Sequence, residues 1–252
     1  MKYCLLLLLA LFVTACARPP EPLWTDIPAP EVLLERLSAR SGKITSLDLA
    51  ASVSVTTAGK HVSSQQFILA EHPDLLRVDA LSGFGQLVMQ LATDGDFLSV
   101  FLNTTSPPKF FHGRATKENF SRFVRLPLPP ELLVAVILYD PPVLGYQQSR
   151  VSSSGEQLEL NLSDGFFSQT FYFDGQLQLV GTDYIEDGNV LFSVEYSRFS
   201  TTDDFPRRIE VRMPTEDAVL AMRISDLVLN AAIPVTKFSL QAPDGIDVEP
   251  IP

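Results

Sequence analysis

The chain has few residues of the types on which most enzyme sites and disulfide frameworks depend. It contains 2 Cys, 1 Trp and 3 His among 252 residues. The histidines are scattered, and no H-E-x-x-H, G-x-S-x-G or Cys/His motif includes them, so we expect them in loops or on strand surfaces. The acidic turn residues also lack the glycine-spaced pattern of a calcium-binding loop. We therefore predict that the protein is not an enzyme and has no catalytic residue, metal site or cofactor.

Basic residues are also scarce. The chain has 19 Lys and Arg against 30 Asp and Glu, which gives a formal net charge of −11. Nucleic-acid binding normally requires a basic patch, and so does electrostatic adsorption to anionic lipid. The composition therefore argues against nucleic acid as a partner. Any association with a membrane should depend on an anchor or on apolar insertion.

A short apolar run opens the chain. Lys2 precedes the uninterrupted segment Leu5 to Val13, and small residues stand before Cys16. The run is shorter than the roughly 20 residues that span a bilayer, and it has the anatomy of a secretory signal peptide. We predict that residues 1–15 are removed. The only other cysteine, Cys4, lies in this segment, so no disulfide can form within the mature chain.

A cysteine directly after such a cleavage site resembles the lipobox of bacterial lipoproteins. The resemblance implies that Cys16 is lipidated and anchors the protein in membrane lipid, and that the Pro-rich residues 16–30 form a tether. Ala17 stands where Asp would favour retention in the inner membrane. We therefore expect attachment to the periplasmic side of the outer membrane. A plain signal peptide with an incidental cysteine is the alternative.

The remainder of the chain alternates between apolar and polar residues over many short stretches, which indicates half-buried β-strands. Gly-containing turn pairs separate the strands at hairpin intervals, at residues 94–95, 154–155, 164–165, 174–175 and 187–188. This pattern predicts one meandering antiparallel sheet, with a last strand at Thr236 to Leu240.

Three stretches have helical character. The first begins at Pro30 and runs to about Ser41, with leucines at helical spacing. Thr116 is a suitable N-cap for a helix over residues 117–124. A third helix is expected over residues 130–138, and its nearly uniform apolar character predicts that it is buried. The fold class is therefore mainly β (α+β), with one folded domain over residues 31–252.

This order of elements resembles the periplasmic lipoprotein carriers and receptors of the LolA/LolB type. Leu76 to Gly85 looks like a strand that ends in the β-turn of that superfamily, and Ala92 to Gly95 looks like the hairpin that follows it. Phe238 to Gly245 is similar to the F-x-L-x-x-P-x-G closing strand of many members. Residues 111–130 also resemble an uncharacterised LolB-like lipoprotein group.

The resemblance implies an incomplete β-barrel of roughly 11–13 strands, whose concave apolar face is covered by the N-terminal helix and the mid-chain helices. It also implies transfer or insertion of lipoproteins at the outer membrane, with an acyl chain or lipoprotein as ligand and a periplasmic carrier protein as a partner. Strand-face and helix residues would form the acyl-binding cavity: Leu33, Leu37, Leu49, Val53, Phe67, Leu69, Val78, Met89, Leu133, Val136, Ile137, Phe192, Val194, Leu220 and Met222.

In the LolB receptor an apolar residue on a protruding loop helps to push cargo into the membrane. The matching turn here contains Gly83, Phe84 and Gly85, and Phe84 is its large apolar residue. Phe84 either inserts into the membrane or folds back onto the core.

Sequence does not separate an open cavity from a filled core, because the same apolar residues build both. The alternative function is therefore a structural or scaffolding lipoprotein of the cell envelope without lipid transfer. A transmembrane barrel is disfavoured, because the chain ends in Ile251-Pro252 without a terminal aromatic strand.

Overall fold

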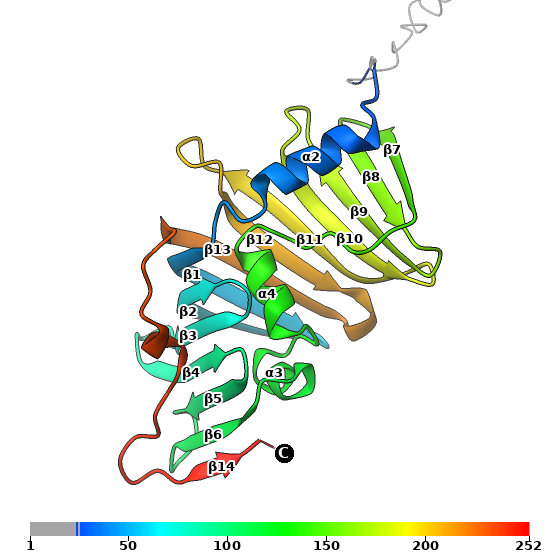
Figure 1. The fold of residues 1–252 in the computed structure, drawn as a ribbon. Helices are drawn as coiled ribbons and strands as arrows, with labels where there is room; N and C mark the ends of the chain where they lie inside the picture. The colour runs from blue at the N-terminus through cyan, green and yellow to red at the C-terminus, as the bar shows by residue number, and fades with distance from the viewer. Residues whose placement is uncertain (1–23, 25, 252) are drawn as a thin grey trace, which may run out of the picture.

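The computed structural model describes residues 24 and 26–251, which form a single open sheet of 14 strands (Figure 1). The strand order is β14-β6-β5-β4-β3-β2-β1-β13-β12-β11-β10-β9-β8-β7. The first strands are β1 (Ser46–Thr57), β2 (Lys60–Glu71), β3 (Leu75–Leu81), β4 (Leu87–Asp94), β5 (Phe97–Leu102) and β6 (Lys109–Arg114). The later strands are β7 (Gln148–Ser154), β8 (Gln157–Ser163), β9 (Phe167–Phe173), β10 (Leu179–Glu186), β11 (Asn189–Phe199), β12 (Pro206–Met213), β13 (Ala218–Leu229) and β14 (Val248–Pro250).

One long-range pairing joins two antiparallel meanders into this sheet. Strand β1 pairs with β2 on one side and with β13 on the other, so that Leu49 lies opposite both Ile68 and Leu227. A register shift between Ala50 and Ala51 marks a bulge in the pairing with β13. The mainly β, curved and open sheet predicted from sequence is confirmed.

The helices lie across one face of the sheet, which is concave (Figure 1). They are α2 (Pro30–Arg40), α3 (Lys117–Val124) and α4 (Pro130–Ile137). The predicted cap of α3 is confirmed, because Thr116 Oγ1 accepts a hydrogen bond from Asn119 N at 3.2 Å. The predicted burial of α4 is also confirmed, and Tyr196 Oη donates a hydrogen bond to Val136 O at 3.3 Å. Helix α4 is therefore held against β11.

The C-terminal segment differs from the prediction. Thr236 to Leu240 is not a strand, because Val235–Phe238 forms the 3-10 helix η2, which packs on β3 and β4 and buries Phe238. Pro234 and Pro243 flank the segment, and proline cannot supply ladder hydrogen bonds. The closing strand is instead β14, which pairs in parallel with β6. A second 3-10 helix, η1 (Pro214–Glu216), lies between β12 and β13.

The start of the described chain is attached to the sheet at Trp24. Its indole Nε1 donates a hydrogen bond to Glu156 O, in the β7–β8 turn, at 3.3 Å. The predicted signal peptide and the lipidation site Cys16 lie outside the described residues. None of the helices in residues 26–251 has the length and hydropathy needed to cross a membrane.

Candidate functional site

The interior of the half-barrel is filled with side chains. Leu49 and Val53 on β1 are 1% and 3% exposed, and Leu133 and Val136 on α4 are 5% and 0% exposed. These side chains belong to one continuous core cluster that reaches from the strands to α4. All but two of the residues predicted to line a cavity point into this packed layer: Leu33, Leu37, Leu49, Val53, Val78, Met89, Leu133, Val136, Ile137, Phe192, Val194, Leu220 and Met222.

Phe67 and Leu69 correct the prediction. On β2 the side chains of Ile68 and Ala70 are buried, whereas Leu69 is partly buried and Phe67 is 52% exposed. Successive side chains of a strand point to opposite faces, so Phe67 and Leu69 lie on the convex face, opposite to the helices. Residues 67–70 are apolar on both faces of β2, so the sequence pattern does not indicate which face is buried. The pairing of Ile68 with Leu49 places Ile68 on the concave face and Phe67 on the convex face.

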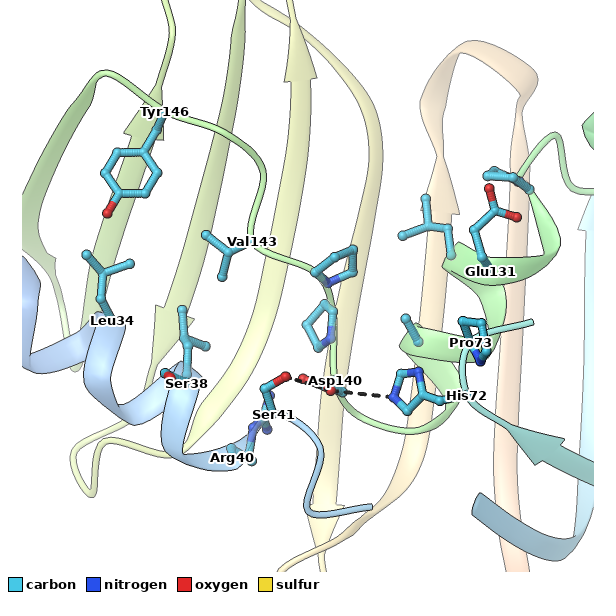
Figure 2. Close-up of a pocket in the computed structure, with 16 residues that line it drawn as sticks. Leu34, Ser38, Arg40, Ser41, His72, Pro73, Glu131, Asp140, Val143 and Tyr146 are labelled. Carbon is cyan, nitrogen blue, oxygen red and sulfur yellow. Dashed lines mark hydrogen bonds and ion pairs between the residues drawn. The ribbon is translucent and has the colours of Figure 1, made fainter. Parts of the chain in front are cut away.

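A cleft of about 790 Å³ lies in the helix layer rather than beneath it. We call it the α2–α4 cleft, because it lies between those helices and the loop of residues 140–146 (Figure 2). In this view Tyr146 and Val143 of the loop lie beside Leu34 and Ser38 of α2. Its apolar lining consists of Leu34, Leu37, Pro73, Pro129, Leu132, Ala135, Pro141, Pro142, Val143 and Tyr146. Of the predicted cavity residues, Leu37 is the one that lines it.

Asp140 joins three elements at one end of this cleft. Its Oδ2 atom accepts hydrogen bonds from Ser41 Oγ and Gly42 N, both at 3.1 Å, at the C-terminus of α2. His72, in the β2–β3 turn, places Nε2 3.5 Å from the same oxygen. Asp140 itself follows α4, and its N–H donates to Ala135 O at 2.9 Å. The carboxylate therefore links α2, α4 and the rim of the sheet (Figure 2).

The Ser, His and Asp side chains are in the wrong order for nucleophilic catalysis. In a catalytic triad the histidine stands between the serine and the aspartate and removes the serine proton. Here the carboxylate stands between Ser41 and His72, so the histidine does not contact the hydroxyl as a base. The geometry therefore fits a structural link rather than an acyl-transfer site.

Buried tyrosines fix the position of the loop beside Asp140. Tyr139 Oη donates to Leu179 O at 2.8 Å, and its ring meets that of Tyr196 edge to face at 4.7 Å. Burial raises the pKa of Tyr139 to about 12, and it also raises the pKa of Tyr196. Both phenols therefore stay protonated near neutral pH and serve as hydrogen-bond donors.

A second cleft, of about 540 Å³, lies on the other side of the last turns of α2. We call it the basic cleft, because Arg36, Arg40 and Lys43 line it. The guanidinium of Arg40 stacks 3.7 Å from the centre of the Tyr139 ring. Both clefts are lined by Leu37 and Arg40, so they are adjacent.

The turn between β3 and β4 holds Phe84 in solvent, at 96% exposure. Ser82 Oγ accepts hydrogen bonds from Phe84 N at 3.3 Å and from Gln86 N at 3.2 Å. Gly85 adopts φ +77°, a conformation that favours glycine, and Gly83 is in open space. In this structure Phe84 therefore points into solvent and not onto the core.

The other histidines make local contacts, as His61 Nδ1 lies 3.1 Å from Thr56 Oγ1 and His112 Nδ1 lies 3.1 Å from Ser99 Oγ. Within the described residues, no group of three or more His, Cys, Asp or Glu side chains is placed to hold a metal ion.

These features define a class of fold, an open antiparallel half-barrel with helices across its concave face. No protein-family model matches the chain, and no curated protein matches it. Among solved structures, a LolA superfamily protein from Nitrosomonas europaea is 14% identical, with a TM-score of 0.54, and the match covers 84% of this chain and 98% of that one.

A DUF1329 family protein from Desulfovibrio piger is 13% identical, with a TM-score of 0.55 and coverage of 83% of this chain and 95% of that one. A putative outer membrane lipoprotein-sorting protein domain from Vibrio parahaemolyticus is 10% identical, with a TM-score of 0.52 and coverage of 83% and 97%. At these identities the likeness is one of fold. The chain has a LolA-like fold.

Sequence reasoning missed the polar residues of the site. Asp140, His72 and Arg40 come from segments far apart in the chain. The one local signal was Tyr139-Asp140-Pro141-Pro142, in which an acidic residue follows a buried helix at once. Spatial proximity, rather than any motif, brings the three side chains together.

Proposed function

We propose that this protein is a lipid-anchored envelope lipoprotein that binds an acyl chain in the α2–α4 cleft and assists lipoprotein or lipid transfer at the outer membrane. The observation that carries the proposal is the apolar cleft of about 790 Å³ on a LolA-like fold. That volume falls within the range of roughly 300–1,000 Å³ typical of small-molecule sites.

The chemistry of the cleft suits an alkyl chain. Leu34, Leu132 and Val143 supply apolar contacts from α2, α4 and the loop. Each methylene that leaves water contributes about 0.8 kcal/mol, so a partly buried chain binds with few polar contacts. Prolines 141 and 142 stiffen the loop wall, which lowers the entropy lost when a ligand binds.

Two features would bring the protein to the membrane, the lipid on Cys16 and the exposed side chain of Phe84. Lipidation of Cys16 would hold an acidic protein at a bilayer that does not attract it electrostatically. We propose that Phe84, held outward on the β3–β4 turn, enters the membrane during transfer. A periplasmic carrier protein would deliver the cargo.

Photocrosslinking tests acyl binding in the cleft. The full-length chain, in nanodiscs of phosphatidylcholine, would be labelled with a photoreactive fatty acid, and the labelled residues mapped by mass spectrometry. We expect labels on residues of the α2–α4 cleft. Ser38 is exposed and lines the cleft, so S38F should fill it and reduce labelling.

Glu35 is also exposed on α2 but does not line the cleft, so E35F is the matched control and should label like wild type. Equal labelling of both variants, or labels elsewhere on the chain, would contradict the proposal.

A second candidate function rests on a different observation. The filled interior, in which Leu49 and Val136 are fully packed, fits a structural or scaffolding lipoprotein that works through its surface. In that case the fatty acid should label no cleft residue, and S38F should leave the function of the protein in the envelope intact.

A further inference from the structure

The apolar cleft and the basic cleft share one wall, the last turns of α2. Leu37 and Arg40 line both of them. A ligand whose alkyl chain lies in the α2–α4 cleft can therefore place a polar head at Arg40 without leaving the surface of α2.

Arg40 is the charged group at this junction. Its side chain is half-buried, with the guanidinium on the face of Tyr139. Within the described residues, its Nη1 atom is buried and has no hydrogen-bond partner, and no ion pair joins Arg40 to a carboxylate. A buried guanidinium N–H group without an acceptor is unfavourable, and an anionic ligand that reaches Nη1 would supply that acceptor.

The surrounding charges support an anion at this place. Arg36 and Lys43 line the same basic cleft and are exposed. Two acidic residues, Asp203 and Asp204, line its opposite side. Asp203 is already paired with Arg207, whose Nη2 lies 2.6 Å from its Oδ2. The three cations of α2 and its following turn therefore outnumber the acidic groups that are free to neutralise them.

We propose that the ligand of the α2–α4 cleft is an anionic single-chain lipid, whose phosphate or carboxylate head is bound by Arg40 with support from Arg36 and Lys43. This inference rests on the proposed acyl binding and adds the chemical class of the lipid. Arginine forms paired hydrogen bonds with phosphate and carboxylate groups, which gives the site its preference for an anionic head over a zwitterionic one.

The test compares two lipids that differ only in the head. The full-length chain in phosphatidylcholine nanodiscs would be titrated with photoreactive lysophosphatidylglycerol or with lysophosphatidylcholine of the same alkyl chain. We expect half-maximal labelling of the wild type at roughly tenfold lower concentration with the anionic lipid, as one charged hydrogen bond predicts. R40Q should remove this preference, and K43Q, at an exposed position, should reduce it.

The control variant is R122Q. Arg122 is the basic residue in the last turn of α3, as Arg40 is in the last turn of α2, so both variants lose the same favourable interaction with a helix dipole. R122Q should keep the lipid preference. Far-UV circular dichroism and thermal melting check that each variant is folded, and K43Q provides the test if R40Q is not.

The outcomes separate the two proposals. Equal labelling by both lipids, or a preference that R40Q retains, overturns the anionic head but leaves acyl binding in place. No labelling of the cleft by either lipid overturns both. Displacement of the anionic lipid by millimolar glycerol phosphate would identify a free phosphate site and would overturn the lipid assignment.

Discussion

The Ser41 hydroxyl donates a hydrogen bond to Asp140 Oδ2 at 3.1 Å, across a separation of 99 residues in the chain. This contact joins the end of α2 to the loop that follows α4. Ser41 and Asp140 both line the α2–α4 cleft, so this contact lies in its wall. Hydrogen bonds to Asp140 thus connect the C-terminus of α2 to the loop that follows α4.

Replacing Asp140 tests how much these hydrogen bonds contribute to stability. D140A removes the acceptor of Ser41 Oγ and Gly42 N and the carboxylate near His72, so the free energy of unfolding should fall by about 1–2 kcal/mol. Urea denaturation measures the change. D48A is the control, because Asp48 is exposed on a strand. A D140A protein as stable as D48A would show that the link contributes nothing.

Truncation of Leu49 tests whether the interior is filled. Leu49 is 1% exposed, so L49A should leave a cavity and destabilise the protein by about 2–5 kcal/mol. Phe67 is 52% exposed on the convex face, and F67A should change stability by much less. Chemical denaturation of the two variants measures the loss in the free energy of unfolding for each. A small loss for L49A would indicate a loosely packed interior that could admit lipid.

Substitution of Phe84 separates membrane insertion from folding. Because Phe84 is 96% exposed, F84E should change the free energy of unfolding by no more than about 0.5 kcal/mol. The same variant should lose cargo insertion into liposomes, since a charged side chain is costly in the bilayer, whereas F84L should retain it. Insertion by F84E at the wild-type rate would refute the role of this turn.

Glu210 predicts a dependence of stability on pH. Burial favours a higher pKa for this carboxyl, but hydrogen bonds from Arg212 and Arg208, with Arg212 Nε 2.6 Å from Oε1, outweigh it and lower the pKa below its ordinary value of 4.5. A lowered folded-state pKa contributes stability above pH 4.5, and that stability is lost as the pH falls through the folded-state pKa.

E210Q should therefore be less stable than wild type by about 1–3 kcal/mol at pH 7, with a difference that shrinks below pH 4.5. Urea denaturation at pH 7 and pH 3 measures both values. E195Q is the control, because the Glu195 side chain is 57% exposed and lies 3.8 Å from Arg212. A difference for E210Q that does not change with pH would contradict the ion pairing.

The sequence by itself determined the local elements. Alternating side chains predicted the strands, Thr116 predicted the start of α3, and the apolar face around residues 130–138 predicted a buried helix. These features depend on neighbours within one or two turns of the chain, so a single sequence contains the information needed. The Asp-Gly turns likewise placed the hairpins that form the two meanders.

Tertiary structure decided what the local pattern left open. The pairing of β1 with β13 joins the meanders, and the register of Leu49 with Ile68 turned Phe67 to the convex face. Packing filled the concave layer and left the cleft between helices instead of beneath them. Arg40 and Asp140 acquired their partners and surroundings from segments about a hundred residues apart. Such contacts depend on how the sheet curves, and the curvature cannot be predicted from the local pattern of apolar residues.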